Sequence, residues 1–509
     1  MEDPILRPKG RWEVPARRSA RMIGPDEFIF LNEKGSLAHC GWDGPEREKL
    51  WRYNQHYFDD LNAKDAEERT QWHLDLLGDW VLHNAPFEGN GWEPYPTSLR
   101  IINWIKWALK GNQLPVFCLQ SMVIQTRWLE KRIEWHLLGN HLFVNAKALV
   151  FAGVYFIGEE ADRWLNKGIQ ILNREIFEQI LPDGGHFERS TMYHALILED
   201  LLDLCNLFEC YKEDLPECIS NQQELWRKFA AQMLTWLDAM CHTDGEISFF
   251  NDAAFNVAPS CRELRKYSSR LKIGSQSLNV ESTYLDDSGY VRLECEEAVV
   301  LLDVAPIGPD YLPGHAHADT LCFEMSMYGQ RLLINTGTSC YRTSKDRLFQ
   351  RSTPAHNTVA IDQKDSSEVW HNFRVARRAT PFKKDVSINS LPMNVEFSHN
   401  GYRRLRGKPI HTRRWQLNYG LLIVEDTVDT TELSAQARFY FHPKVKLKVF
   451  DQTGIALLPG GQEVNWFVES GRSCCEDSEW YPQFGESLQN KCLVVDLVDG
   501  KSKVCWFWD

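Results

Sequence analysis

The period of the hydrophobic pattern changes once along this chain, near residue 280, and that change limits which folds are possible. From about residue 45 to 272, apolar residues recur at three- and four-residue spacing, as in "SLRIINWIKWAL" (98–109) and "ELWRKFAAQMLTWLDAM" (224–240). This spacing is typical of amphipathic helices. After about residue 285, apolar and polar residues alternate, as in "YVRLECEEAVVLL" (290–302), which indicates β-strands. The pattern predicts a helical domain followed by a β domain.

A chain of 509 residues exceeds what one hydrophobic core usually holds. Successive helices without intervening strands predict an α/α toroid or a solenoid, and we find no repeat of fixed length that would favour a regular array. The later strands predict an antiparallel β-sandwich. We therefore expect an N-terminal extension (1–44), an incomplete α/α toroid (45–278) and an antiparallel β-sandwich (279–509), with a cleft for a polymer between the two large domains.

Charge and apolar content exclude several classes of protein. The net charge of −13 argues against a general nucleic-acid binder, which is usually basic. Two basic segments, 373–384 and 402–414, still offer local sites for an anion. The longest apolar stretch, "ALVFAGVYFIG" (148–158), is too short to cross a membrane. None of these features predicts an oligomeric state.

The N-terminus and the cysteines bear on the compartment. The first residues lack the apolar core of a signal peptide, and the 14 cysteines are scattered through apolar patterns without a CxxC motif. This usage predicts a cytoplasmic protein, or a periplasmic or secreted one if a leader has been removed.

The segment "YLPGHAHADTLCFEM" (311–325) places His315, His317 and Asp319 at alternate positions. In an extended backbone such positions share one face, which Leu321, Phe323 and Met325 would continue as a packed strand. Imidazole and carboxylate groups on one face suit metal binding or proton transfer. A polar strand end whose histidines only form hydrogen bonds has the same pattern, so both interpretations remain open at this point.

Three further segments carry polar side chains near the ends of predicted elements: "GNHLFVNAKAL" (139–149), "DGGHFERSTMYH" (183–194) and "RSTPAHNTVAID" (351–362). A capping or packing role would explain any one of these side chains. Together they supply amides, histidines and a tyrosine that a purely structural role does not require.

Seven segments, taken in order, resemble the heparinase II/III family of polysaccharide lyases. They are "WRYNQHYFDDL", "NHLFVNAKALVFAG", "DGGHFERSTMYH", "DGEISFFNDAA", "GHAHADTLCFEM", "AHNTVAID" and "SSEVWHNFRVARRA", between about residues 50 and 380. Seven ordered matches are more specific than any single motif. The resemblance implies an α/α toroid followed by an antiparallel β-sandwich, in agreement with the hydrophobic periodicity.

The resemblance also implies a reaction, β-elimination at a uronic acid in a glycan such as heparan sulfate, chondroitin or hyaluronan. The enzyme must neutralise the carboxylate beside C5, remove the C5 proton with a base and protonate the departing O4 with an acid. By this resemblance, Asn140 with His141 would neutralise the carboxylate, and Tyr193 would be the general acid and a candidate base. His315 would assist as a base.

A structural divalent metal, either zinc, manganese or calcium, is implied in the same way. Its ligands would be His317, His356 and the residue at position 335 in the β domain. The family commonly has an aspartate at that last place, whereas this chain has Asn335. An amide oxygen is a weaker ligand than a carboxylate, and Asp319 is the alternative if the strand geometry allows it.

Anionic polysaccharides are bound by guanidinium groups, which pair bidentately with sulfate and carboxylate, and by aromatic rings. The predicted substrate-binding residues are Trp92, Tyr95, Arg100, Glu188, Arg189, Arg351 and Arg374.

Two alternative functions remain open from the sequence. A glycoside hydrolase on the same toroid frame would need two carboxyl groups across a cleft, and Glu188 with Asp252 is the pair that the chain offers. A non-catalytic polysaccharide-binding protein would not depend on the hydroxyl of Tyr193.

Overall fold

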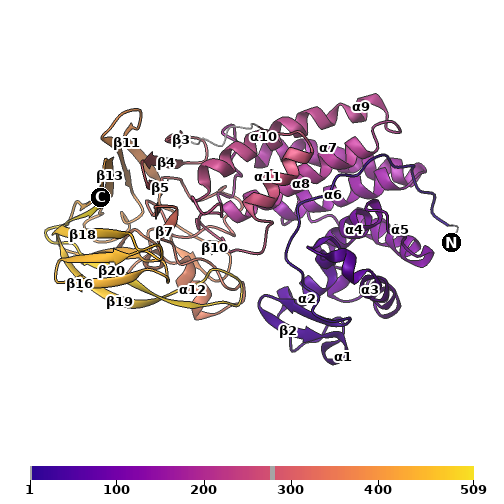
Figure 1. The fold of residues 1–509 in the computed structure, drawn as a ribbon, viewed down its shortest axis with the longest axis horizontal. Coiled ribbons are helices and arrows are strands. Elements are labelled where there is room, and N and C mark those ends of the chain that lie inside the picture. The colour runs from indigo at the N-terminus through magenta and orange to yellow at the C-terminus, as the bar shows by residue number, and fades with distance from the viewer. Residues whose placement is uncertain (1–2, 275–280) are drawn as a thin grey trace. The chain divides into compact units, whose positions relative to one another are not determined.

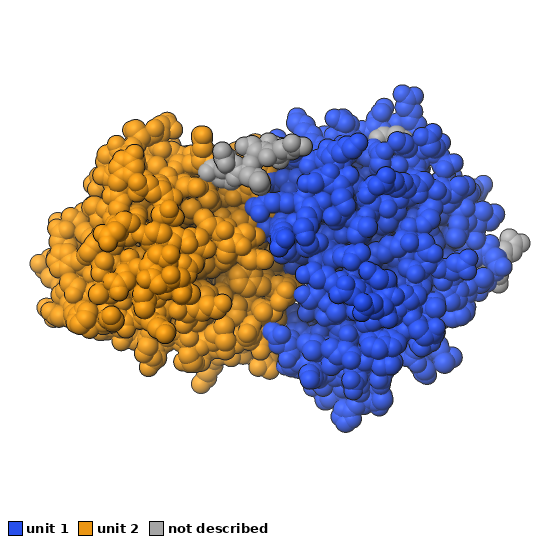
Figure 2. All heavy atoms as spheres, viewed as in Figure 1, with its two compact units in different colours: residues 1–180, 195–234, 258–275 blue, residues 181–194, 235–257, 276–509 orange. Residues whose placement is uncertain are grey.

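The computed structural model describes residues 3–274 and 281–509 (Figure 1). The chain divides into two compact units, each made of separate stretches of sequence (Figure 2). Unit 1 comprises residues 1–180, 195–234 and 258–275, and unit 2 comprises residues 181–194, 235–257 and 276–509. The predicted order, a helical region followed by antiparallel sheets, is confirmed.

The first half of the chain is helical apart from a short hairpin of β1 (Glu27–Phe30) and β2 (Glu33–Ser36). Its helices are α1 (Leu37–Cys40), α2 (Lys49–Tyr57), α3 (Thr70–His83), α4 (Pro94–Leu109), α5 (Val116–Lys131), α6 (Gly139–Tyr155), α7 (Glu159–Gln179), α8 (Thr191–Cys210), α9 (Glu217–Ser220), α10 (Gln222–Met240) and α11 (Cys261–Arg270). No helix in the described part of the chain is both long and apolar enough to cross a membrane.

Helix α6 is the most enclosed helix of unit 1, because every residue after His141 is buried. Two glycines allow α7 to approach it closely. A Cβ atom at Gly153 would lie 2.5 Å from the backbone nitrogen of Leu165, and one at Gly168 would lie 2.8 Å from the carbonyl oxygen of Ala146. Any larger residue at either position would push the two helices apart.

A buried ion network joins four helices of unit 1. Asp203 on α8 accepts hydrogen bonds from Lys106 on α4 at 2.8 Å and from Lys147 on α6 at 2.7 Å. Lys147 also donates to Asp200 at 2.7 Å, and the hydroxyl of Tyr267 on α11 donates to Asp203 at 3.0 Å. Because these side chains are buried, each charge depends on its partners for stabilisation.

Unit 2 is built from antiparallel sheets. The eight-stranded sheet has the order β11-β12-β13-β14-β21-β18-β17-β16, the five-stranded sheet β3-β4-β5-β6-β7, and the four-stranded sheet β19-β20-β15-β8. Strands β9 and β10 form a separate hairpin.

The strands of unit 2 are β3 (Thr283–Leu285), β4 (Tyr290–Cys295), β5 (Ala298–Asp303), β6 (Phe323–Met327), β7 (Gln330–Leu333), β8 (Val359–Ile361), β9 (Val369–Trp370), β10 (Arg374–Val375), β11 (Pro381–Ser387), β12 (Met393–His399), β13 (His411–Asn418), β14 (Leu421–Val428), β15 (Ala435–Tyr440), β16 (Lys446–Phe450), β17 (Thr453–Leu457), β18 (Glu463–Ser470), β19 (Arg472–Trp480), β20 (Leu488–Asp496) and β21 (Lys501–Phe507). Helix α12 (Lys345–Arg351) lies between β7 and β8 in the sequence.

The three larger sheets of unit 2 share one apolar core. Strand β13 buries every second residue, as period-two alternation predicts. Its Trp415 packs in the same cluster as Val291 of the five-stranded sheet and Phe439 of the four-stranded sheet. Burial of apolar surface on these inner faces is the main force that holds the sheets together.

The compact units differ from the predicted division at residues 45–278 and 279–509. Two stretches of the predicted toroid, 181–194 and 235–257, belong to unit 2. Asp183 accepts two hydrogen bonds from Ser288, and Trp236 shares a core cluster with Tyr290. Residues 1–44 are grouped with the helices of unit 1 rather than forming a separate extension.

The ion network of unit 1 gives a stability prediction. We expect Asp203→Asn to lower the free energy of unfolding by about 3–5 kcal/mol, because it leaves buried lysine charges without their shared carboxylate. Chemical denaturation followed by tryptophan fluorescence measures the change. Asp214→Asn, at an exposed position of the same unit, is the matched control. Equal effects of the two substitutions would contradict a stabilising role for the network.

Candidate active site

The predicted ribbon of His315, His317 and Asp319 is a loop, whereas the packed strand predicted to continue it is present from Phe323 onward as β6. Residues 311–322 are irregular, and β6 begins only at Phe323. Buried side chains hold the loop instead of a sheet ladder. The Arg351 guanidinium donates to the carbonyl of Ala316 at 3.0 and 3.2 Å, and Oδ1 of Asn251 accepts from the backbone N–H of His317 at 3.0 Å.

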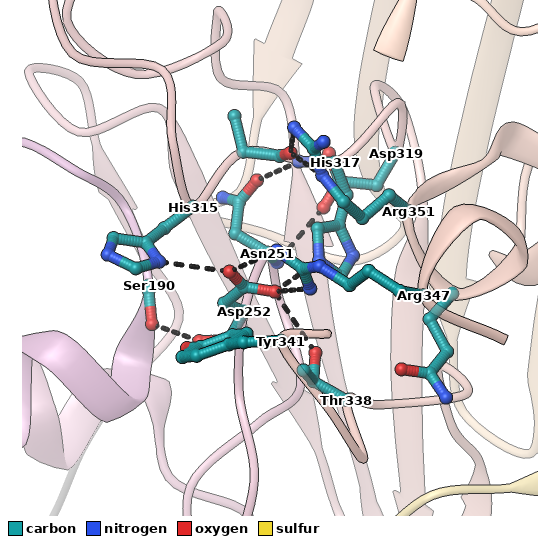
Figure 3. Close-up of polar contacts among 12 residues, drawn as sticks. Ser190, Asn251, Asp252, His315, His317, Asp319, Thr338, Tyr341, Arg347 and Arg351 are labelled. Atoms are coloured by element: carbon teal, nitrogen blue, oxygen red, sulfur yellow. Dashed lines mark hydrogen bonds and ion pairs between the residues drawn. The ribbon is translucent and has the colours of Figure 1, made fainter. Parts of the chain in front are cut away.

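The two histidines nevertheless share a partner, the carboxylate of Asp252 (Figure 3). Nδ1 of His315 lies 2.9 Å from Oδ2, and Nε2 of His317 lies 2.8 Å from Oδ1. Arg347 donates to both carboxylate oxygens, with Nη2 2.8 Å from Oδ2, and the hydroxyl of Thr338 donates to Oδ1 at 3.3 Å. We call these five residues the Asp252 cluster.

The cluster fixes the charge of Asp252. Burial alone would raise the pKa of this carboxyl, but the Arg347 guanidinium and the hydrogen bonds from His315 and His317 hold it well below its usual range. Asp252 is therefore an anion at neutral pH and can only accept hydrogen bonds. Each histidine must donate an N–H to it, so in the neutral form of His315 the lone pair lies on Nε2.

His315 is the part of the cluster that solvent reaches. Its side chain is 17% exposed, whereas those of Asp252, His317 and Arg347 are fully buried. Nε2 of His315 also lies 3.7 Å from a carboxylate oxygen of Glu188. The arrangement presents one oriented imidazole nitrogen at the surface of the cluster, where a base could meet a substrate.

Tyr193 stacks on this imidazole. The ring centroids of Tyr193 and His315 are 3.9 Å apart with an interplanar angle of 30°. The Tyr193 hydroxyl lies 2.9 Å from the hydroxyl of Tyr341. Ser190 fixes the first turn of α8, because its Oγ accepts from the backbone N–H of Tyr193 at 3.2 Å and donates to the backbone carbonyl of Asp252. Figure 3 shows Ser190 beside Asp252. The predicted Tyr193 and His315 therefore come together.

Burial, together with Tyr341 and the Asp252 carboxylate, raises the pKa of Tyr193 well above its usual range. The pKa of Tyr341 is raised as well, mainly by burial. Both phenols are neutral at physiological pH. Tyr193 can thus give a proton to a strongly basic leaving group, and it is a weak base in its resting state.

The residues predicted to neutralise a substrate carboxylate lie in unit 1. Asn140 and His141 occupy the first turn of α6. The ring of the predicted binding residue Tyr95 contacts that of His141, with centroids 4.4 Å apart and an interplanar angle of 37°. Nδ1 of His141 lies 3.2 Å from a carboxylate oxygen of Glu134. These three predicted residues form one polar group within unit 1, whereas Tyr193 and His315 belong to unit 2.

Three predicted substrate-binding residues are buried in the interior. The Arg100 guanidinium lies 3.8 Å from the ring of Trp80, and Trp92 is only 2% exposed. Arg351 is fully buried and donates to loop carbonyls, among them that of His371 at 2.9 Å. These positions do not support the predicted contacts with substrate, because each polar group is already used inside the fold.

The other three predicted binding residues of unit 2 differ in exposure. Arg374 is exposed on β10. Arg189 is half-buried, and its Nε donates to the carbonyl of Ser288 at 2.9 Å. Glu188 is 2% exposed and lies beside His315. Of the three, Arg374 is the one best placed to meet an anion from solution.

The predicted metal ligands fit only in part. His317 and His356 come together, with Nδ1 and Nε2 3.3 Å apart. Asn335 does not fit, because its Oδ1 accepts from the backbone N–H of Asn357 at 3.1 Å. Its Nδ2 donates to the carbonyl of Phe249 at 3.0 Å. These backbone partners fix the amide, and the predicted set of His317, Asn335 and His356 is incomplete.

Sequence reasoning missed Arg347 and Tyr341, and it considered Asp252 only as a hydrolase carboxyl. Arg347 lies on α12, and Tyr341 lies in the loop before it. The segment that holds both, "SCYRTSKDRLFQ" (339–350), has no spacing that links it to Asp252, which lies about 90 residues earlier. A buried arginine and an aspartate that far apart in sequence are paired only by the tertiary fold.

Sequence profiles of two family regions match this chain. The one described as "Heparinase II/III N-terminus" covers residues 102–267, and the one described as "Heparinase II/III-like, C-terminal" covers residues 278–506. A heparin-sulfate lyase of Bacteroides stercoris is 24% identical over 344 residues, which are 63% of this chain and 51% of that protein. A heparin-sulfate lyase of Pedobacter heparinus is 25% identical over 251 residues, which are 45% of this chain and 36% of that protein. This chain thus spans about half, or less, of the length of these curated relatives.

A solved structure titled "Crystal Structure of Heparinase III" superposes with a TM-score of 0.71 at 17% identity, covering 93% of this chain and 80% of that one. At this identity the likeness shows a shared fold. The predicted fold class, an incomplete α/α toroid followed by an antiparallel β-sandwich, is confirmed.

The low pKa of Asp252 predicts how the free energy of unfolding depends on pH. Because this pKa is lower in the folded than in the unfolded chain, the stabilisation by Asp252 is complete above about pH 5 and is lost as the pH falls below about 4. We expect Asp252→Asn to lower the free energy of unfolding at pH 7 by about 3–5 kcal/mol. Chemical denaturation at several pH values should show that the difference from wild type shrinks below about pH 4.

The matched control is Asp310→Asn, since the Asp310 side chain is 99% exposed and pairs with Arg378 at the surface. We expect this substitution to have little effect at any pH. A loss for Asp252→Asn that stays constant down to pH 3 would contradict the inferred ion pair.

Proposed function

This chain belongs to the heparinase II/III-like family, and on that premise we propose that it is a polysaccharide lyase that cleaves a uronate-containing glycosaminoglycan by β-elimination. The product would carry an unsaturated uronate. Relatives named as heparin-sulfate lyases favour heparan sulfate as the substrate, with chondroitin and hyaluronan as the alternatives within the same chemistry.

One observation carries the proposal: an oriented histidine base stacked on a neutral tyrosine. The ionised Asp252 accepts Nδ1–H of His315 at 2.9 Å and leaves Nε2 outside this hydrogen bond. Tyr193 keeps its proton because burial raises the pKa of its hydroxyl. A base and an acid side by side match the two proton transfers of an elimination.

In the proposed reaction, Nε2 of His315 takes the proton from C5 of the uronate. The electron pair of the broken C–H bond forms the C4–C5 double bond, and the C4–O4 bond breaks. The departing O4 takes the proton of the Tyr193 hydroxyl. Asp252 stabilises the imidazolium that forms, and a proton returned from His315 to the Tyr193 phenolate restores both groups.

Removal of the C5 proton also requires that the neighbouring carboxylate be neutralised. Family resemblance assigns this role to Asn140 with His141, and an amide or imidazole N–H is a suitable donor to a carboxylate. Both lie in the polar first turn of α6, where backbone N–H groups of the helix also favour an anion. In the proposal, Asn140 therefore binds the uronate carboxylate of an anionic polysaccharide.

The hydrolase alternative is disfavoured by the state of Asp252. A glycosidase needs two carboxyl groups that reach the glycosidic bond, one as an acid and the other as a base or nucleophile. Asp252 is fully buried, and its oxygens accept hydrogen bonds from His317 and Arg347. It is therefore poorly placed to be the second carboxyl group of such a pair.

Removal of the Tyr193 hydroxyl tests whether Tyr193 is the general acid. We expect Tyr193→Phe to fold normally and to lower the turnover number by about two to four orders of magnitude, the usual scale for losing general acid catalysis. The assay follows the ultraviolet absorbance of the unsaturated uronate with heparan sulfate, chondroitin sulfate or hyaluronan as substrate. Hydrolysis would not produce this absorbance.

Tyr328→Phe is the matched control, because the Tyr328 hydroxyl donates at 2.6 Å to the carbonyl of Asp509, outside the Asp252 cluster. It should retain wild-type turnover. Full activity of Tyr193→Phe would show that another group protonates O4, and wild-type binding of these glycans without any absorbance change would favour the non-catalytic alternative.

The dependence of the Michaelis constant on salt provides a second test, of whether the substrate is a polyanion. A chain of net charge −13 binds a polyanion only through local basic surface, and such contacts are screened over about 8 Å at physiological ionic strength. We expect the Michaelis constant to rise steeply with added salt while the maximal rate changes less. Arg374→Gln should raise the Michaelis constant and reduce its dependence on salt.

Arg472→Gln, at an exposed arginine on β19, is the control for this test, and it should change neither quantity. An affinity that does not respond to salt in the wild-type protein would argue for a neutral glycan and against the proposed substrate class.

A further inference from the structure

A pocket of about 580 Å³ lies on the surface of unit 1, and the proposed reaction does not use it. It is formed by the end of α5, the segment that follows α5 and the first half of α7. Pockets of roughly 300–1,000 Å³ are typical of small-ligand sites. We call it the Trp135 pocket, and the residues that line it are Glu130, Lys131, Ile133, Trp135, Arg163 and Lys167.

Positive charge dominates the Trp135 pocket. Its three cationic side chains and one carboxylate leave two net positive charges, in a chain whose net charge is −13. Arg163 already balances the carboxylate, because it donates to the two oxygens of Glu130 at 2.8 and 3.2 Å. Lys167 donates to the backbone carbonyl of Glu130 at 2.8 Å, and Lys131 is exposed. The surplus charge therefore resides on two ammonium groups that can bind an anion from solution.

Trp135 adds an aromatic surface to this charge. Its side chain is 47% exposed, although Ile133 and Glu134 just before it are buried. The guanidinium of Arg174 on α7 lies 5.3 Å from the centre of the Trp135 ring. An exposed indole beside cations offers a flat apolar face for a sugar ring and positive charge for the anionic groups that the sugar carries.

The segment that carries Trp135 is fixed against α6. The backbone N–H of Glu134 donates to Oδ1 of Asn145 at 2.9 Å, and Nδ2 of Asn145 donates to the carboxylate of Glu134 at 3.2 Å. Both residues are buried, so these hydrogen bonds are shielded from water. The position of Trp135 is therefore set before a ligand arrives, which lowers the entropic cost of binding.

The pocket lies close to the first turn of α6. Trp135 precedes Gly139, the first residue of α6, by four positions, so at most about 14 Å separates their Cα atoms. In the proposed function, Asn140 in that turn binds a uronate carboxylate. One polysaccharide chain can therefore occupy the first turn of α6 and the Trp135 pocket together.

We propose that the Trp135 pocket binds a sulfated saccharide unit of the polysaccharide, away from the bond that is cleaved. The identity of the glycan rests on the proposed function. Sulfate esters pair with Lys131 and Lys167, and the sugar ring stacks on Trp135. The pocket thereby favours a sulfated glycan over hyaluronan, which has uronates but no sulfate. Free inorganic sulfate shares the charge but cannot use the ring.

The test is equilibrium binding of a heparan sulfate decasaccharide to the full chain, measured by titration calorimetry. All variants carry Tyr193→Phe, so that the glycan is not consumed. We expect the double substitution Lys131→Gln and Lys167→Gln to weaken binding about tenfold, the scale for losing two exposed charge contacts. Trp135→Ala should weaken it by a similar factor, while Trp135→Phe, which keeps a ring, should retain most of the affinity.

The double substitution Lys212→Gln and Lys266→Gln is the matched control. It removes the same charge from two exposed lysines of unit 1 that pair with Glu209 and Glu263, outside the pocket. It should keep the affinity of the parent protein. An unchanged affinity in the pocket variant, or an equal loss in this control, overturns the proposal.

Two further probes separate the chemistry of the ligand. A hyaluronan decasaccharide should bind the parent protein and the double lysine variant of the pocket equally, and an equal loss for both glycans would overturn recognition of sulfate. Trp135→Ala should not change the binding of inorganic sulfate. If Trp135→Ala also leaves the affinity for the decasaccharide unchanged, the pocket is a simple anion site and the proposed saccharide contact is wrong.

The binding test fails separately from the proposed reaction. If the pocket variants lose affinity while the wild-type chain forms no unsaturated uronate, the pocket is supported and the lyase proposal is wrong. If the wild-type chain cleaves heparan sulfate and the pocket variants bind it as tightly as the parent protein, the lyase proposal is supported and the pocket is not a glycan site.

Discussion

The ionised carboxylate of Asp252 is the interaction on which the candidate site depends. Arg347 balances its charge from α12, and His315 and His317 bind its two oxygens from the loop before β6. Its own backbone N–H donates to the carbonyl of His315 at 3.0 Å. A buried anion tolerates few other arrangements, because each missing donor would leave it uncompensated. The orientations of His315 and His317 follow from satisfying this one group, while Arg351 and Asn251 also hold the loop on which they lie.

This constraint assigns different tasks to two histidines that are one residue apart. Through Asp252, His315 keeps its proton on Nδ1 and presents Nε2 to solvent, which suits a base in the proposed lyase reaction. His317 donates Nε2–H to the same carboxylate and turns Nδ1 towards His356. One carboxylate thereby orients one histidine for proton transfer and the other towards His356. Both histidines lie within one hydrogen-bonded network, so loss of the Asp252 carboxylate would affect both.

Several residues chosen from the sequence for substrate binding serve the interior instead. Arg100 stacks on Trp80, and Arg351 holds the loop carbonyl of Ala316. A guanidinium has the same chemistry in either place, because it pairs with a sulfate or with buried carbonyls and rings. Sequence alone cannot separate these uses, since burial depends on what the rest of the chain packs around the residue. Among the predicted binding arginines of unit 2, Arg374 is exposed, Arg189 is half-buried and Arg351 is fully buried.

The amino-acid sequence by itself determined the order of helices and antiparallel strands, because the 3.6- and 2-residue hydrophobic periods are local properties. It also determined the family, because ordered motifs such as "GHAHADTLCFEM" and "DGGHFERSTMYH" carry that information directly. Only the tertiary structure decided that residues 311–322 form a loop, that Arg347 balances Asp252, and that Cys322 lies beside His356. Those pairings join residues far apart in sequence, and they form because buried charges and polar atoms must find partners wherever the packed fold provides them.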